Sequence, residues 1–205
     1  SVDHARARLR QMRSKTTQQR HFVFRTHGGK RCGAGRKPSG ARAGVSHGQR
    51  GDLSGREPVL VTLKMRDRVW NLRTRRAFAE LLPRFFAARE RLGMRLVHFS
   101  VQRDHIHLVV EVAGVVALSR GVQGLSVRVA RALNRMMKRR GKVFADRFHH
   151  RVLATPRQLR TALAYVLCNA RKHGEAPTVR GWLDPYSSAR SFDGWRRGVG
   201  ERLAD

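Results

Sequence analysis

The chain has 205 residues, of which 44 are lysine or arginine and 14 are aspartate or glutamate, giving a formal net charge of +30 and a pI near 12.0. A chain of this length can bury one core of ordinary size but hardly two. So large an excess of positive charge argues against a typical metabolic enzyme and favours nucleic acid as the partner. Composition alone favours a protein that coats RNA over one that binds acidic membranes, and it does not separate coating from cleaving.

Two kinds of segment are missing from the sequence. It contains no run of about 18 or more apolar residues, and its first residues, SVDHARARLRQMRSK, lack the apolar stretch of a secretory signal. Cys32 and Cys168 are far apart and have no CxxC partner, which argues against a disulfide framework or a cysteine zinc site. We therefore expect a cytoplasmic, nucleoid-associated protein of bacterial type with no membrane partner.

Residues 1–57 are rich in arginine, lysine, glycine and serine and show no sustained periodicity, which indicates a flexible basic arm. A glycine-rich stretch of this arm could follow a DNA groove or backbone and become ordered on contact. An equally good interpretation is a solvated tail that raises nonspecific affinity through counterion release. The candidate DNA-binding residues of this stretch are Lys30, Arg31, Arg36 and Lys37.

Residues 58–175 are predicted to form the core, and residues 176–205 an irregular C-terminal extension. The core begins with a strand-like apolar run, VLVTLKM. A helical pattern then starts at Thr74 and runs to Leu92, where Gly93 is the expected stop. Pro83 is expected to kink or split this helix because it removes a backbone donor.

A hairpin follows, because the apolar runs RLVHFSVQ and HIHLVVEV are separated only by Arg103 and Asp104. With these two residues as the turn, Gln102 lies opposite His105 and Ser100 lies opposite His107. This face of the hairpin is predicted to be polar. The other face is predicted to enter the core through Val97, Phe99, Val101, Ile106, Leu108 and Val110.

The rest of the core alternates helix and strand. A long amphipathic helix is expected from about residue 118 to Arg140, ending at Gly141, and a strand within residues 143–153. Thr155, with a proline and a glutamine after it, is the predicted N-cap of a last helix that closes at Gly174. This order predicts an α+β fold, a ferredoxin-like antiparallel sheet with helices mainly on one face.

The polar face of the hairpin carries the most reactive side chains. His105 and His107 are two residues apart on a strand, so they point the same way and could share one cation. Tyr165 and Asn169 are four apart on the last helix and lie on one face. Each feature taken singly is an ordinary surface or core-edge pattern. Together they suggest chemistry, because a phenol with a pKa near ~10 needs a metal to attack a phosphodiester, and Asn169 could be the third ligand.

Three segments in this order, VQRDHIHLVVE, GKVFADRFHHRVL and LAYVLCNARKHG, resemble the HUH-type single-tyrosine transposases, especially the REP-associated tyrosine transposases and their insertion-sequence relatives. The resemblance covers roughly residues 58–175. It implies that His105, His107 and Asn169 are ligands for Mg or Mn, and that Tyr165, on the last core helix, is the nucleophile. The proline and asparagine usual before the first histidine are Arg103 and Asp104 here, and the usual Asn-Pro is Asn169-Ala170, yet no reactive group is lost.

The resemblance also implies a substrate, single-stranded DNA near a hairpin, and a reaction, cleavage and strand transfer through a covalent 5′-phosphotyrosine. Arg147, His149 and Lys172 are further candidates for contact with the nucleic acid. Two other functions stay open: a non-cleaving hairpin-binding protein derived from a transposase, and a replication-initiator or relaxase-type HUH nuclease. A homodimer, and a tyrosine that works in its partner's site, also stay open.

Overall fold

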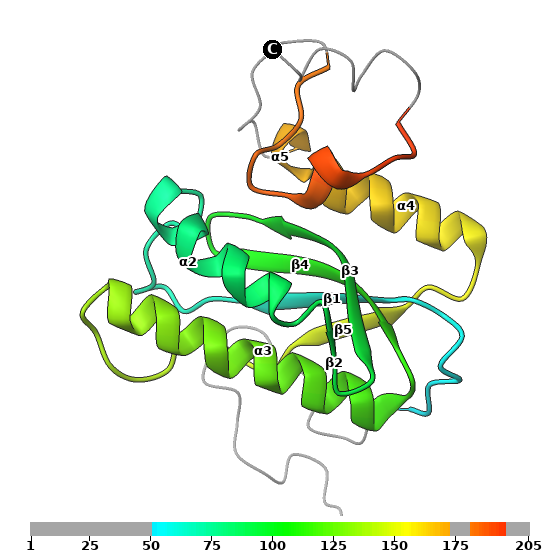
Figure 1. Ribbon diagram of the computed structural model, residues 1–205, viewed down its shortest axis with the longest axis horizontal. Coiled ribbons are helices and arrows are strands. Elements are labelled where there is room, and N and C mark those ends of the chain that lie inside the picture. Colours follow the sequence, from blue (N-terminus) through cyan, green and yellow to red (C-terminus); the bar gives the residue numbers. More distant parts are fainter. Residues whose placement is uncertain (1–50, 173–180, 196–205) are drawn as a thin grey trace, which may run out of the picture. The chain divides into compact units, whose positions relative to one another are not determined.

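The computed structural model describes residues 51–172 and 181–195, so Lys30, Arg31, Arg36 and Lys37 lie outside the described residues and their contacts stay predictions (Figure 1). Within the described chain, no helix is long and apolar enough to cross a membrane. The elements in order are β1 Val59–Lys64, α2 Arg75–Phe86, β2 Glu90–Arg91, β3 Met94–Val101, β4 His105–Val112, α3 Val115–Met136, β5 His149–Val152, α4 Pro156–Leu167, α5 Asn169–Lys172 and the 3-10 helix η2 Ser188–Ser191.

The sheet has five strands in the order β2-β3-β4-β1-β5, and every neighbouring pair is antiparallel. This confirms the predicted α+β fold with an antiparallel sheet. The register of the central hairpin is also as predicted: Ser100 pairs with His107, and the Gln102 backbone N–H donates to the His105 carbonyl at 2.8 Å. Strand β4 lies in the middle of the sheet, so its histidines have β3 on one side and β1 on the other.

A β-bulge corrects one part of the predicted core. The pairing of β3 with β4 shifts between Leu96 and His98, so that Val97 is the extra residue. Such an insertion exchanges the two faces of the strand on one side of the bulge. Leu96 is therefore buried in the core, and Val97 is 39 % exposed.

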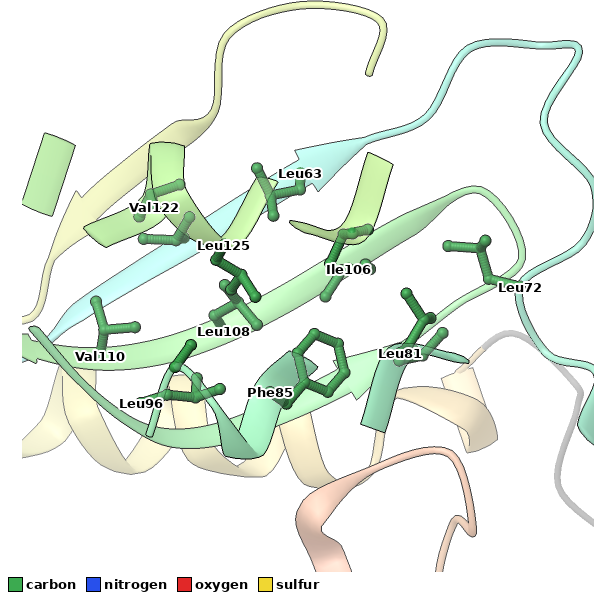
Figure 2. Close-up of a cluster of buried hydrophobic side chains, with 14 of the residues drawn as sticks. Leu63, Leu72, Leu81, Phe85, Leu96, Ile106, Leu108, Val110, Val122 and Leu125 are labelled. Carbon is green, nitrogen blue, oxygen red and sulfur yellow. The ribbon is translucent and has the colours of Figure 1, made fainter. Parts of the chain in front are cut away.

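Apolar side chains cover both faces of the sheet. Helices α2 and α3 pack on one face and close the main core, part of which is shown in Figure 2. Helix α4 packs on the histidine face, where a second cluster contains Val109, Leu153, Ala162 and Val166. The histidine face is thus polar around the imidazoles and apolar beyond them, which gives α4 a surface to pack on. Two of the three long helices share one face, as predicted, and the tyrosine-bearing helix takes the other.

Two helices end earlier than predicted. Helix α2 contains Pro83 without being split and ends at Phe86. The chain then forms a tight hairpin between β2 and β3, in which Leu92 and Gly93 have φ of 55° and 71°. Two successive positive φ values are typical of the type I′ turn of hairpins, so Gly93 marks a turn and not the end of a helix. Helix α3 ends at Met136, before Gly141.

Two glycines of α3 allow a test of how closely this helix approaches the sheet. A Cβ added at Gly121 would lie 2.7 Å from both Cβ and Sδ of the buried Met94, whereas a Cβ at Gly124 would meet nothing closer than Arg128 at 3.6 Å. Gly124→Ala should raise the free energy of unfolding by up to ~1 kcal/mol through helix propensity. Gly121→Ala should lower it by about 1–3 kcal/mol through overpacking. Urea denaturation of both variants checks this, and equal stabilisation would contradict the close approach of α3 to β3.

Candidate active site

The two histidines of β4 project together from the face that α4 covers. Their ring centroids are 4.6 Å apart, with the rings inclined at 76°. His107 is buried, and the side chain of His105 is 20 % exposed. The predicted alternation therefore brings the two imidazoles together, one deep and one closer to solvent.

Each imidazole is held through its Nδ1 atom. His105 Nδ1 lies 2.7 Å from Asp104 Oδ1, and His107 Nδ1 lies 3.0 Å from Thr62 Oγ1 on β1. Burial would raise the pKa of Asp104, but the hydrogen bond to His105 and the nearby charges of His105 and Lys64 outweigh burial and hold that pKa below its usual range. Groups that hold Nδ1 in this way fix the ring orientation and leave Nε2 to bind a ligand.

Tyr165 reaches this pair from α4. Its hydroxyl lies 3.2 Å from His107 Nε2, and the two rings are 4.9 Å apart at 69°. The helix starts as predicted: Thr155 Oγ1 accepts from the Gln158 N–H at 3.2 Å, and Gln158 Oε1 accepts from the Ala154 N–H at 2.9 Å. Because the apolar side of α4 packs on the sheet, Tyr165 is directed at His107 and is half-buried.

Asn169 is placed differently from the prediction of one continuous helix. Helix α4 ends at Leu167, Cys168 has a non-helical φ of −109°, and Asn169 begins the short α5. The side chain is 1 % exposed, and neither amide atom has a hydrogen-bond partner in the described part of the chain. Asn169 therefore makes no hydrogen bond to either imidazole. A buried amide left unpaired costs about 1–3 kcal/mol, so a ligand that bonds to the Asn169 amide would stabilise the fold.

A second unpaired amide oxygen lies on the hairpin. Gln102 is 2 % exposed, its Nε2 donates to Ser100 Oγ at 2.7 Å, and its Oε1 has no partner among the described residues. Its main chain pairs with His105, so it belongs to the same edge of the site. Amide carbonyl oxygens, together with imidazole nitrogens, are donors that Mg or Mn can take.

Acidic and cysteine side chains of the described chain do not form a metal-binding cluster with the histidines. No group of three or more histidine, cysteine, aspartate or glutamate side chains is close enough there to hold a metal. Asn169 and Gln102 each bury an amide oxygen without a partner among the described residues. Imidazole nitrogens and amide oxygens are ligand types that suit a divalent cation.

The other predicted DNA contacts are dispersed. His149 is exposed on β5 and pairs with Thr62, which puts it on the face of His107. Arg147 is half-buried just before β5, and its backbone N–H donates to Asp146 Oδ1 at 2.7 Å. Lys172 is the last residue of α5. Their contacts with DNA stay predictions.

Sequence reasoning missed Thr62 and Asp104 as partners of the histidines. Thr62 is the polar residue of the otherwise apolar run VLVTL, and a polar side chain on a central strand is a signal in itself. Asp104 lies in the predicted turn and also holds His105, and a carboxylate directly before a histidine pair is a typical orienting group. Neither pairing could be assigned without the register of β1 against β4 and the turn geometry.

The fold matches that of a solved tyrosine transposase. A family model described as "Transposase IS200 like" matches residues 58–167, more than half of the chain, so the chain belongs to this family. The resemblance read from the sequence is thereby confirmed.

One solved structure agrees with this assignment at the level of the fold. A REP-associated tyrosine transposase bound to a REP hairpin has a TM-score of 0.57 and 18 % identity, covering 70 % of this chain and 82 % of that chain. A candidate transposase from Deinococcus radiodurans R1 has a TM-score of 0.39 and 14 % identity, covering 66 % of this chain and 100 % of that chain. No curated protein sequence matches the chain.

Proposed function

We propose that this protein is a metal-dependent single-strand DNA endonuclease and strand-transfer enzyme that forms a covalent 5′-phosphotyrosine at Tyr165. The observation that carries the proposal is the 3.2 Å separation between the Tyr165 hydroxyl and His107 Nε2 in a member of the IS200-like transposase family. The REP hairpin bound by the structural relative supports hairpin or repeat DNA as the substrate class. The net charge of +30 supports a nucleic-acid partner.

The reaction exchanges one phosphodiester for another. The phenol oxygen of Tyr165 loses its proton and bonds to phosphorus, the bond from phosphorus to the 3′ oxygen breaks, and that oxygen leaves as a hydroxyl after taking up a proton. A bound Mg or Mn would offset the negative charge that develops on the phosphate. Asp104 and Thr62 hold the imidazoles, and α4 holds the phenol beside them. Tyr165 contacts His107 of its own chain, which supports a tyrosine that acts in its own subunit.

The proposal is tested by trapping the intermediate. The protein is incubated with labelled single-stranded hairpin oligonucleotides in Mg or Mn, or with a chelator, and denatured. We expect a denaturation-resistant adduct that requires the metal, and mass spectrometry should locate the attached nucleotide on Tyr165. Attachment at another residue would overturn the proposal. Hairpin binding without any adduct across many flanking sequences would favour the non-cleaving alternative.

The proposed third ligand makes a separate prediction. Asn169→Ala should abolish the rise in Tm that Mn produces in the wild type, because a ligand that binds only the folded state stabilises it by about 2.7 kcal/mol at 100 times its Kd. Asn169→Asp keeps an oxygen at the same position and should retain the rise. Differential scanning calorimetry with and without Mn measures this. An unchanged rise in Asn169→Ala would remove Asn169 from the ligand set.

A further inference from the structure

A groove of about 550 Å³ lies between α4 and the strands β1 and β5, and His107 and Tyr165 are part of its lining. Arg151 and Arg157 also line it, and Arg157 precedes Tyr165 by two turns of α4, about 12 Å along the helix. The groove therefore continues the candidate active site along the surface. Its remaining lining consists of Leu60, Thr62, Leu153, Gln158, Thr161 and Ala162.

The two arginines converge on the groove from different elements. Arg151 on β5 pairs with Leu60, so it lies on the face of the sheet that α4 covers. Arg157 is the second residue of α4, and Thr161 Oγ1 donates to its carbonyl at 2.9 Å. Both are exposed, and neither guanidinium forms a hydrogen bond or ion pair within the described chain. No acidic side chain lines the groove, and the first turn of α4 has none.

Part of the groove lining is an apolar floor. Leu60, Leu153 and Ala162 form it, and they belong to the cluster that packs α4 on the sheet. A nucleotide has the complementary character, because its sugar and base carry apolar surface and its phosphate carries the charge. Arginine is suited to the phosphate, since its planar guanidinium can donate two parallel hydrogen bonds to phosphate oxygens.

We propose that this groove binds the nucleotide next to the scissile phosphodiester, with the sugar and base on the apolar floor and the flanking phosphate on Arg151 and Arg157. The position beside the bond to be cut rests on the proposed function, but binding of the strand does not require cleavage. The groove would fix the strand so that the bond to be cut lies at Tyr165. Arg151 and Arg157 would then set the register of the cut.

The test compares two arginines of the same helix. Arg157 lines the groove, whereas Arg160 is exposed on α4 outside it. In a Tyr165→Phe background, affinity for a single-stranded hairpin oligonucleotide is measured over a range of salt concentrations. We expect Arg157→Ala to reduce the salt slope by about 0.7, the value for one phosphate contact on a single strand, and Arg160→Ala to leave it nearly unchanged. An equal reduction of the salt slope in both variants would mean that only net charge matters, and it would contradict the proposed phosphate contact.

Neutral phosphates then locate the contact. In a set of oligonucleotides, each carries one methylphosphonate at a different position. Their affinities for Tyr165→Phe and for Tyr165→Phe with Arg157→Ala are compared. The loss of affinity caused by Arg157→Ala should vanish when the methylphosphonate is next to the bond that the wild type cleaves, because that phosphate no longer carries the charge. An effect that persists at every position would contradict the groove assignment. An Arg157-dependent contact without any tyrosine adduct would instead refute the proposed function and leave the groove intact.

Discussion

Tyr165→Phe is expected to reduce covalent attachment of DNA by more than about 10³-fold, because removal of a nucleophile leaves only positioning and electrostatic assistance. The phenyl ring of the variant would stay against His107, since the ring contact at 4.9 Å does not need the hydroxyl. Folding and hairpin affinity should therefore change little. Adduct formation is followed on denaturing gels, and affinity by fluorescence anisotropy.

The chain provides its own matched control, because Tyr186 is its other tyrosine. The Tyr186 ring packs edge-on against Phe78 at 5.2 Å, and its hydroxyl forms no hydrogen bond in the described part of the chain. Tyr186→Phe should keep full adduct formation. A DNA adduct that persists in Tyr165→Phe, or that is lost in Tyr186→Phe, would show that Tyr165 on α4 is not the nucleophile.

Local periodicity in the sequence predicts the part of the site that lies on the β3–β4 hairpin. Alternation on β4 puts His105 and His107 on one face, and the two-residue turn at Arg103 and Asp104 sets the register with β3. Both follow from spacing within a dozen residues. The encounter of Tyr165 with His107 joins residues 58 apart. Spacing could not predict that encounter, and the family resemblance supplied it.

Other features depend on packing that no local pattern encodes. Val97 fits the alternation of a strand, but the bulge after Leu96 exposes it. Gly93 fits a helix end as well as a hairpin turn, and the pairing of Glu90 with Arg95 decides for the turn. Asn169 fits a continuous helix, and the break at Cys168 places it on α5. In each case the local pattern fits two structures, and the pairing or helix break in the folded chain decides between them.

A buried ion pair ties the C-terminal segment to the sheet. The guanidinium of Arg73 donates to both carboxylate oxygens of Asp184, at 2.8 and 3.0 Å, and to the Val101 carbonyl at 3.0 Å. The two side chains are 6 % and 1 % exposed. The same segment contacts the end of the tyrosine helix, because Leu183 packs with Leu167. The pair therefore holds together the edge of the hairpin and the end of α4.

Asp184→Ala should lower the free energy of unfolding by about 3–5 kcal/mol, because it leaves the charge of Arg73 buried without its partner. Glu111→Ala is the matched control, since Glu111 pairs with Arg95 at the surface, where the two side chains are 42 % and 58 % exposed. An exposed pair contributes about 0–1 kcal/mol. Urea denaturation measures both. Equally small losses of unfolding free energy in both variants would mean that Arg73 bonds to water or to another acceptor. The ion pair with Asp184 would then not be needed to hold α4 beside the histidines.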